Sequence, residues 1–240
     1  MKTEVKPYNT EATKKTEVED MFDNIAPKYD FLNRTLSMKV DLLWRKNLVN
    51  WLKKDQPKDI LDVATGTGDL AIAIEKSTQA NIVGLDLSQQ MLNIGIEKVK
   101  KLNLSDKIKM LKGDAENLPF EDNRFDSVTS SFGVRNFENL EKGLAEFRRV
   151  VKNGHSIYIL EFSKVEGILA PFYMFYFKHI LPRIGKLVSK DSRAYTYLPD
   201  SVNAFPYGEE MKSILLKVGF KEVEYKKQSF GIATIYKATK

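Results

Sequence analysis

Cysteine is absent from the 240-residue sequence, and histidine occurs only twice, at His155 and His179. The lack of cysteine excludes disulfide bonds, thiolate metal ligands and a cysteine nucleophile. Because only two imidazoles are available, a zinc or iron centre is not expected, and we predict no metal site.

Long hydrophobic runs are also missing. No apolar stretch approaches the ~20 residues that a membrane-spanning helix needs. Residues 1–20 are polar and alternately charged, without the apolar core of a signal sequence. We therefore expect a cytoplasmic protein, with the inner face of the cell membrane as a surface that it contacts peripherally. The net charge of +6 permits anionic partners without requiring them.

A nucleotide-binding pattern is present at residues 60–69, which read Ile-Leu-Asp-Val-Ala-Thr-Gly-Thr-Gly-Asp. A short apolar run ends in a loop that contains Gly66 and Gly68, and apolar residues then return with helical spacing. Glycines let a backbone approach a ligand closely, and the first amides of a new helix remain free donors. The stretch therefore predicts a strand, a tight turn and a helix that together bind a nucleotide.

The glycines alone fit either of two cofactors. Asp86 ends the apolar run 82–85 and would hold the ribose hydroxyls of NAD or of S-adenosylmethionine. Asp62 and Asp69 flank the glycines, and their charges would repel a pyrophosphate but suit a ligand that carries an ammonium and a sulfonium. The acids favour S-adenosylmethionine, which leaves as S-adenosylhomocysteine. A glycine turn with acids that only cap it is the plainer alternative.

Strands and helices alternate regularly after this loop. Short apolar runs predict strands at 60–63, 82–85, 108–111, 125–129 and 156–162. A helical pattern that Gly219 caps then leads to a terminal strand pair at 220–227 and 232–237. We predict an α/β fold with a doubly wound, mostly parallel sheet and a C-terminal antiparallel pair.

We expect a flexible tail at residues 1–17 and a single domain at 18–240. Residues 18–55 predict two helices, the first of which stops at Pro27. They form either a cap over the carboxyl edge of the sheet or helical packing beneath it.

The segment 163–207 interrupts the alternation of strands and helices. Its aromatic run 168–177 is followed by several cations. We interpret it as a lid over a hydrophobic substrate or as a contact with a membrane surface. An insertion helix packed on the core is the plainer alternative.

The ends of the third and fourth strands supply further candidate residues. Gly113-Asp114-Ala115 follows the third strand, where the carboxylate would accept the adenine amino group and the small Ala115 would admit the ring. The loop 130–137 follows the fourth strand and would lie beside the transferable methyl group.

Five segments carry a family resemblance: Tyr29-Asp30 with Asn33, Ser37 and Trp44-Arg45; Leu61–Asp69; Ser131–Asn136; Leu160–Ser163; and Tyr195–Leu198 with Ser201 and Phe205-Pro206. From about Met21 to its end, the chain resembles the quinone-biosynthetic C-methyltransferases. This family includes demethylmenaquinone methyltransferase and its ubiquinone-pathway relative. The resemblance implies that the domain at 18–240 is a methyltransferase domain with the fold of class I S-adenosylmethionine-dependent methyltransferases. It also implies contacts with S-adenosylmethionine at Thr67, Asp86, Asp114, Ala115 and Ser131.

One segment departs from the pattern. Where the superfamily commonly has Pro-Gly-Gly, this chain has Asn153-Gly154-His155. We expect the departure to affect stability more than activity, with His155 as a turn residue and not a catalyst.

The resemblance implies methylation of a ring carbon in a reduced polyprenyl quinone. The expected reaction converts demethylmenaquinol to menaquinol, and methylation of a methoxybenzoquinol in ubiquinone biosynthesis is the alternative. We predict that Arg135 stabilises the phenolate form of the ring, with Asn136 as a hydrogen-bond partner. Alternatively, Arg135 pairs with an acid and braces its loop. Tyr195 and Tyr197 line the ring pocket or serve packing alone.

Three other function classes compete with this interpretation. The acids around the glycine loop argue against an NAD-linked oxidoreductase, whereas a non-catalytic binding module is left open. A nucleic-acid methyltransferase is not expected, because Ser131–Val134 lacks the Asn/Asp-Pro-Pro-aromatic turn that holds a flipped base. The expected partner is a polyprenyl quinol. The oligomeric state is left open, with a homodimer as one option.

Overall fold

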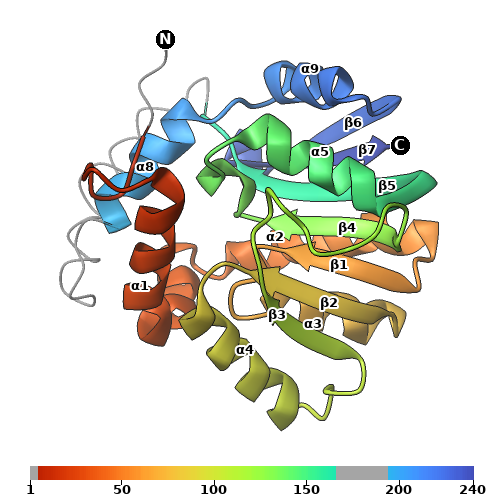
Figure 1. Cartoon of the computed structure of the whole chain (residues 1–240), viewed down its shortest axis with the longest axis horizontal. Coiled ribbons are helices and arrows are strands. Elements are labelled where there is room, and N and C mark those ends of the chain that lie inside the picture. Colours follow the sequence, from red (N-terminus) through yellow and green to blue (C-terminus); the bar gives the residue numbers. More distant parts are fainter. Residues whose placement is uncertain (1–4, 166–193) are drawn as a thin grey trace.

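The computed structural model describes residues 5–165 and 194–240. The aromatic run 168–177 and most of the segment 163–207 lie outside these residues, as does the side chain of Tyr195. Within the described residues, a single sheet has helices on both of its faces (Figure 1).

The sheet has the strand order β3-β2-β1-β4-β5-β7-β6. Its strands are β1 Asp59–Val63, β2 Asn81–Asp86, β3 Ile108–Lys112, β4 Phe125–Ser131, β5 Val151–Phe162, β6 Glu222–Gln228 and β7 Ala233–Thr239. The first five strands are parallel, whereas β7 runs antiparallel to both β5 and β6. The predicted fold class is confirmed.

Helices connect these strands and cover the sheet. They are α1 Lys14–Leu36, α2 Val40–Leu52, α3 Asp69–Thr78, α4 Gln89–Lys101, α5 Leu140–Val150, α8 Ala194–Ala204 and α9 Glu209–Val218, with the short 3-10 helices η1 Lys53–Asp55, η2 Val134–Asn136 and η4 Ser229–Gly231. Ser88 caps α4 by accepting the backbone N–H of Met91, as expected from its sequence position. Gly219 ends α9 in a left-handed conformation.

The core forms two apolar layers, one on each face of the sheet. In β1, Leu61 and Val63 pack in the layer with α5 and α9, whereas Ile60 packs in the layer with α2 and α3. All three side chains are fully buried. Burial on both faces is typical of a central parallel strand. It holds the carboxyl end of β1, where the glycine loop starts, in a fixed position.

Helix α1 continues through Pro27, so the predicted stop at that residue is wrong. Proline lacks the N–H that would bond the carbonyl of Asp23, and this loss disfavours a helix interior. The apolar face nevertheless continues on both sides, since Ile25 and Leu32 are buried. Tertiary packing therefore outweighs the local penalty.

The start of α1 lies inside the segment that the sequence predicts to be a tail. The helix begins at Lys14, and the carboxylate of Glu17 accepts hydrogen bonds from the backbone N–H groups of Tyr8, Asn9 and Thr10. Glu17 is 1% exposed. The approach to α1 is thus fixed by one buried acid, which pattern analysis did not reveal.

The two N-terminal helices divide the roles that the sequence left open. Helix α1 lies beside the carboxyl ends of the parallel strands (Figure 1) and contacts α4 and η2. Helix α2 packs against α3 and β5, on one face of the sheet. The expected cap is therefore α1, and the expected packing is α2.

Residues 153–155 form a bulge in β5 and not the turn that the sequence suggested. The pairing of β4 with β5 shifts between Phe125 and Ser127, and Gly154 has φ +77°. Nδ1 of His155 lies 3.0 Å from the carbonyl oxygen of Asp126. Between the pairs Phe125–Val151 and Ser127–Ser156, β4 has one residue and β5 has four, so three extra residues are accommodated in β5 and the strand begins earlier than predicted.

Candidate functional site

The loop after β1 has the conformation that its glycines suggest. Gly66 and Gly68 have φ +57° and +80°, and Ala64 also has a positive φ of +54°. The N–H of Gly68 closes the turn on the carbonyl of Thr65 at 2.9 Å. Residues other than glycine rarely adopt a positive φ, which explains why glycine occurs twice within three residues.

Asp86 joins this loop to the end of β2. One carboxylate oxygen accepts the N–H of Gly66 at 2.7 Å, and the other accepts the N–H of Ser88 at 2.9 Å. Burial raises the pKa of Asp86 to about 6, although these hydrogen bonds oppose the shift. The carboxylate lines a cavity, where hydroxyl donors or a cation on a ligand would stabilise its charge.

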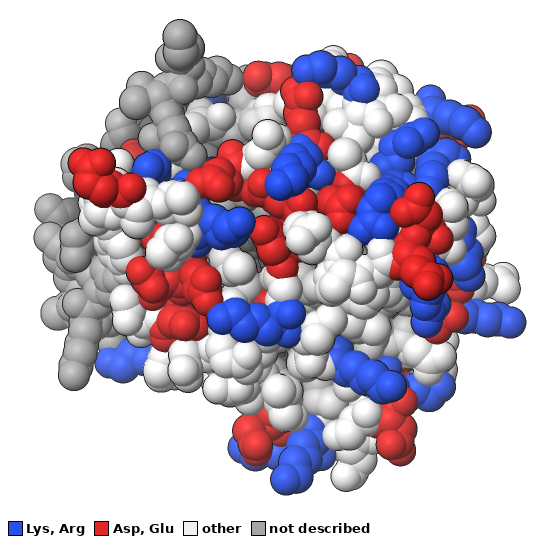
Figure 2. Space-filling model, in the orientation of Figure 1, with Lys and Arg blue, Asp and Glu red and all other residues white. Residues whose placement is uncertain are grey.

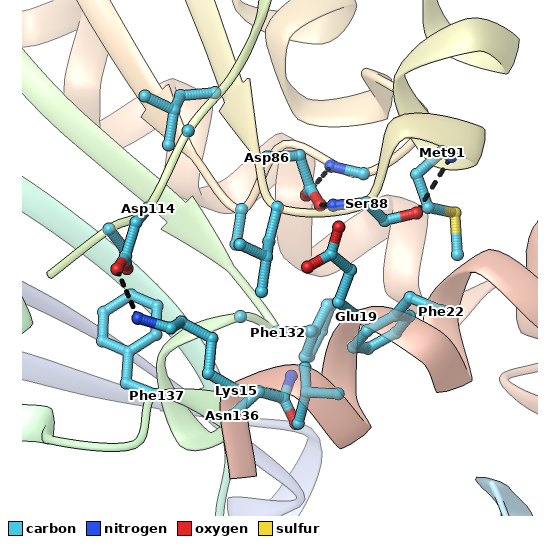
Figure 3. Close-up of a pocket in the computed structure, with 18 of the residues that line it drawn as sticks. Lys15, Glu19, Phe22, Asp86, Ser88, Met91, Asp114, Phe132, Asn136 and Phe137 are labelled. Carbon is cyan, nitrogen blue, oxygen red and sulfur yellow. Dashed lines mark hydrogen bonds and ion pairs between the residues drawn. The ribbon is translucent and has the colours of Figure 1, made fainter. Parts of the chain in front are cut away.

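This cavity lies between α1 and the carboxyl ends of the parallel strands, and we call it the strand-end cavity (Figure 3). It encloses about 740 Å³, including the part open to solvent. Residues from four strand ends and from α1 line it, among them Lys15, Glu19, Phe22, Gly66, Asp86, Asp114, Ala115, Ser131, Phe132 and Asn136. Six of the sequence-predicted site residues thus surround one space.

The end of β3 contributes Asp114 and Ala115 to this cavity. Asp114 accepts a hydrogen bond from Nζ of Lys15 at 2.9 Å, across the cavity from α1 (Figure 3). This hydrogen bond raises the pKa of Lys15. A side chain at Gly113 would approach Leu85 to 2.7 Å, so glycine keeps the floor of the cavity closely packed.

Three predicted cofactor residues, one in β1 and two in the loop that follows it, do not line the cavity. Asp62 is 1% exposed and accepts hydrogen bonds from the hydroxyls of Thr65 and Thr129, both at 2.7 Å. Burial raises the pKa of Asp62 to about 6. The hydroxyl of Thr67 donates to Asp30 at 2.6 Å, and Gly68 faces Met110. These residues hold the loop in shape.

The negative charge of Asp69 is largely neutralised by neighbouring cations, whereas the sequence argument treated it as unpaired. Its carboxylate pairs with Lys98 at 2.7 Å and also with Arg34. Asp86 and the buried Asp62 therefore remain as the acids next to the glycine loop that lack a lysine or arginine partner among the described residues.

A second cavity, which we call the apolar cavity, lies between α1, α2 and the segment 229–232 that precedes β7. It encloses about 1600 Å³, including the part open to solvent, and most of its lining is hydrophobic: Met21, Ile25, Leu32, Leu36, Trp44, Phe162, Leu198, Phe230 and Ile232. Polar groups enter it at a few points, which are Tyr29, Asn33, Arg45 and Arg135. Such a lining suits a largely apolar ligand with a few polar atoms.

The two cavities share part of their walls. Phe22, Tyr29 and Phe132 line both of them. Phe132 follows β4 and has φ +61°, which is an unusual conformation for an aromatic residue. Its ring stacks on Phe162 with centroids 4.5 Å apart. Strain of this kind concentrates at functional sites, and here it lies where the two cavities adjoin.

Arg135 lines the apolar cavity, one residue away from Asn136 in the strand-end cavity. Nη1 of Arg135 donates to Glu161 at 2.9 Å, which is the bracing ion pair that the sequence left as an alternative. Glu161 is fully buried, and burial raises its pKa while Arg135 opposes the shift. Oδ1 of Asn136 accepts the hydroxyl of Tyr197 at 3.1 Å.

Sequence reasoning assigned no role to several residues of this site. Tyr29, Arg45 and Glu161 lie in segments of the family resemblance, which was a signal available in the sequence. Lys15 lies in the expected tail, and only the course of α1 brings it to Asp114. In the described part of the chain, no group of three His, Asp or Glu side chains is arranged to hold a metal ion.

The lining of the strand-end cavity fits S-adenosylmethionine. A half-buried carboxylate ends β2, a second acid follows β3, and Gly66 offers open space beside the loop. A side chain at Gly133 would lie 2.4 Å from Ala64, so the loops after β1 and β4 approach each other closely.

Comparisons with known proteins agree with this geometry. The ubiE/COQ5 methyltransferase family model matches residues 10–240. A demethylmenaquinone methyltransferase of Bacteroides fragilis is 48% identical over 238 residues, which cover 98% of this chain and 97% of that protein. A ubiquinone/menaquinone biosynthesis C-methyltransferase, UbiE, of Geobacter sulfurreducens is 46% identical over 226 residues, or 93% and 88% of the two chains.

Solved structures support the fold. The crystal structure of a S-adenosylmethionine-dependent methyltransferase from Thermotoga maritima has a TM-score of 0.64 and 18% identity, covering 92% of this chain and 98% of that one. In the described part of this chain, no helix has the length and hydrophobicity to cross a bilayer. The family resemblance found in the sequence is confirmed, and the chain belongs to the ubiE/COQ5 methyltransferase family.

Proposed function

We propose that this chain methylates a ring carbon of demethylmenaquinol to give menaquinol, with S-adenosylmethionine as the methyl donor. The names of its relatives support this reaction. The structural observation that carries the proposal is the wall of Phe22, Tyr29 and Phe132, which two cavities of different character share. Because the two cavities adjoin at these residues, a methyl donor in one cavity and an aromatic acceptor in the other would lie next to each other.

The strand-end cavity would bind the donor. Asp86 would accept the ribose hydroxyls, Asp114 would accept the adenine amino group, and Ala115 and Ser131 would border the bound nucleoside. Once bound, S-adenosylmethionine supplies an electrophilic methyl group. Asp62, Thr67 and Gly68 would contribute indirectly, because they fix the loop that carries Gly66.

The apolar cavity would bind the acceptor, with the polyprenyl chain along its hydrophobic lining. Carbon becomes nucleophilic when a ring hydroxyl loses its proton, and a nearby cation stabilises the resulting phenolate. Arg135 would provide this cation, and its pairing with Glu161 would hold it in place. Arginine does not accept protons at physiological pH, so water would take the proton. Asn136 would position the reacting ring through its contact with Tyr197.

A benzoquinol ring is the second candidate acceptor. The Geobacter relative carries a name that includes both ubiquinone and menaquinone biosynthesis. The experiment is methyl transfer from labelled S-adenosylmethionine to reduced demethylmenaquinone and, in parallel, to a reduced polyprenyl methoxybenzoquinone. We expect label in menaquinone. Label only in the benzoquinone would show that the acceptor is the benzoquinol and not demethylmenaquinol. Label in neither quinone would overturn the proposal.

We also propose that the mouth of the apolar cavity contacts the membrane that holds the acceptor. Met38 and Phe230 line this cavity and are 79% and 84% exposed. Both have positive φ, +49° and +58°, so the chain holds two apolar side chains outward in unfavourable turns. Exposed Lys39 and Lys227 lie nearby in the sequence and would attract anionic lipid headgroups.

Two hydrogen bonds join the segments that carry this exposed pair. Nε1 of Trp44 donates to Ser229 at 2.8 Å, and Nδ2 of Asn47 donates to Gln228 at 2.8 Å. By contrast, acidic and basic side chains are interspersed on the face of the molecule drawn in Figure 2. Such a mixed surface favours neither nucleic acid nor an anionic membrane.

A further inference from the structure

Three buried polar atoms lack a hydrogen-bond partner in the described part of the chain. They are Nε of Arg45, Oγ of Ser130 and Nε of Arg135. Two of them lie at Phe132, since the guanidinium carbon of Arg45 lies 5.2 Å from its ring centroid and Arg135 donates to its carbonyl oxygen, and the third belongs to Ser130, two residues earlier in the chain. Buried polar groups without partners are uncommon, so the presence of two of them at one aromatic residue points to a ligand.

Arg45 is the member of this group for which the proposed reaction has no role so far. It lies in α2, is 7% exposed and lines the apolar cavity beside Trp44. Its Nη1 pairs with Asp41, but Asp41 already pairs with Arg34. Arg34 is therefore sufficient to neutralise the charge of Asp41, and it does so from outside the cavity. The position of Arg45 in the wall of the cavity is not explained by the charge of Asp41 alone.

The aromatic pair Phe132 and Phe162 relates Arg45 to Arg135. Arg45 lies over the Phe132 ring, and the guanidinium carbon of Arg135 lies 5.4 Å from the centroid of Phe162. The two rings are 4.5 Å apart. Two guanidinium groups therefore border the same aromatic floor, and each keeps one buried N–H donor unused.

We infer that Arg45 binds the second oxygen of a dioxygenated aromatic ring, while Arg135 binds the first. This inference rests on the proposed function and deepens it, because it assigns the specificity for a ring with two oxygens. Nε of Arg45 donates a hydrogen bond and carries positive charge, so it favours an ionised oxygen over a neutral one. Arg45 transfers no proton, and its role is to orient the ring and hold its charge.

The test uses two naphthoquinone probes. The hydroxyl of 2-hydroxy-1,4-naphthoquinone is ionised at neutral pH, whereas 1,4-naphthoquinone has no ionisable group. Each is titrated into the full-length protein, with quenching of tryptophan fluorescence as the signal. Trp44 lines the apolar cavity, with its ring centroid 6.1 Å from that of Phe132. The absence of cysteine removes thiol addition to the quinone as a complication.

The variants are Arg45→Gln and, as a matched control, Arg34→Gln, which removes the other arginine partner of Asp41. We expect Arg45→Gln to weaken binding of the anionic probe about 10-fold or more and to change binding of the neutral probe less than about 2-fold. Arg34→Gln should leave both affinities unchanged, although both variants lose thermal stability to a similar extent. Arg45→Lys, which keeps the charge, should retain part of the preference for the anion.

Two outcomes would overturn the inference. One is an equal loss of anion binding in Arg45→Gln and Arg34→Gln, which would indicate a purely structural role through Asp41. The other is a wild-type protein that binds the two probes with the same affinity. Failure of the proposed function is distinguishable, because it appears as a lack of methyl transfer to either reduced quinone by the wild-type protein.

Discussion

The strand-end cavity and the apolar cavity differ in how the chain builds them. Apart from α1, the strand-end cavity comes from loops that directly follow β1, β2, β3 and β4. The apolar cavity combines α1 and α2 with Phe162 of β5, Tyr197 of α8 and Phe230 of η4, which are far apart in the sequence. The parallel sheet thus supplies a general nucleotide site, and the additional helices supply the space for a particular acceptor.

The largest expected effect is the loss of donor binding in the strand-end cavity when Asp86 is removed. Asp86→Ala is expected to lower the affinity for S-adenosylmethionine by about 100-fold or more, because a half-buried carboxylate that would accept ligand hydroxyls is lost. Isothermal titration calorimetry measures the loss. Binding of 1,4-naphthoquinone in the apolar cavity should remain.

Asp86→Asn serves as the milder variant, since its amide oxygen keeps an acceptor for one of the two N–H groups, that of Gly66 or that of Ser88. Replacement of the exposed Asp106 by alanine is the matched control for the loss of an acid. Unchanged S-adenosylmethionine affinity in Asp86→Ala would show that the donor does not bind at the end of β2.

Removing Arg135 should affect the acceptor side and spare the donor side. Arg135→Ala is expected to lower kcat about 100-fold, because the phenolate loses its cation, while S-adenosylmethionine affinity changes less than about 2-fold. Steady-state kinetics and calorimetry together make the measurement.

A control is needed because Arg135→Ala leaves Glu161 buried without its partner. The double variant Arg135→Gln with Glu161→Gln removes both charges and should fold more stably while remaining slow. Wild-type turnover in either variant would exclude the catalytic role given to Arg135.

The pH dependence of donor binding sharpens the comparison further. Burial raises the pKa of Asp86 to about 6, so the carboxylate is ionised above this pH and protonated below it. Affinity for the positively charged donor should therefore fall about 10-fold as the pH drops from about 7 to about 5. Binding of 1,4-naphthoquinone should not follow this change. A pH dependence that persists in Asp86→Asn would assign the effect to another group.

The smallest effect concerns the mouth of the apolar cavity. The double variant Met38→Ser with Phe230→Ser should reduce sedimentation with vesicles of phosphatidylglycerol and phosphatidylcholine several-fold, since two exposed apolar side chains are lost. Leu216→Ser is the matched control, because Leu216 is exposed on α9, away from the cavity. Equal sedimentation of both variants would contradict the proposed membrane contact.

The contrast between the cavities explains what could be predicted from the sequence. Gly66, Asp86, Asp114 and Ser131 each follow a strand directly, and parallel strands bring their carboxyl ends together. Local pattern was sufficient to find them. Predicting where Asp62 points was harder, because its hydrogen bond to Thr129 depends on how β1 pairs with β4.

The apolar cavity could not be predicted in the same way. The hydrogen bond between Trp44 and Ser229 joins residues 185 positions apart, and no sequence pattern predicts it. The course of α1 through Pro27 follows from tertiary burial that overrides the local rule. Arg45 appeared only as part of a family motif, and its position over Phe132 emerged from the packing of α2.

The most direct test of this account is a crystal structure of the full chain with S-adenosylhomocysteine and 2-hydroxy-1,4-naphthoquinone bound together. We predict the nucleoside against Asp86 and Asp114 in the strand-end cavity, and the naphthoquinone in the apolar cavity, with both ligands in contact with Phe132. A naphthoquinone bound away from Phe132, or a nucleoside outside the strand-end cavity, would contradict the account.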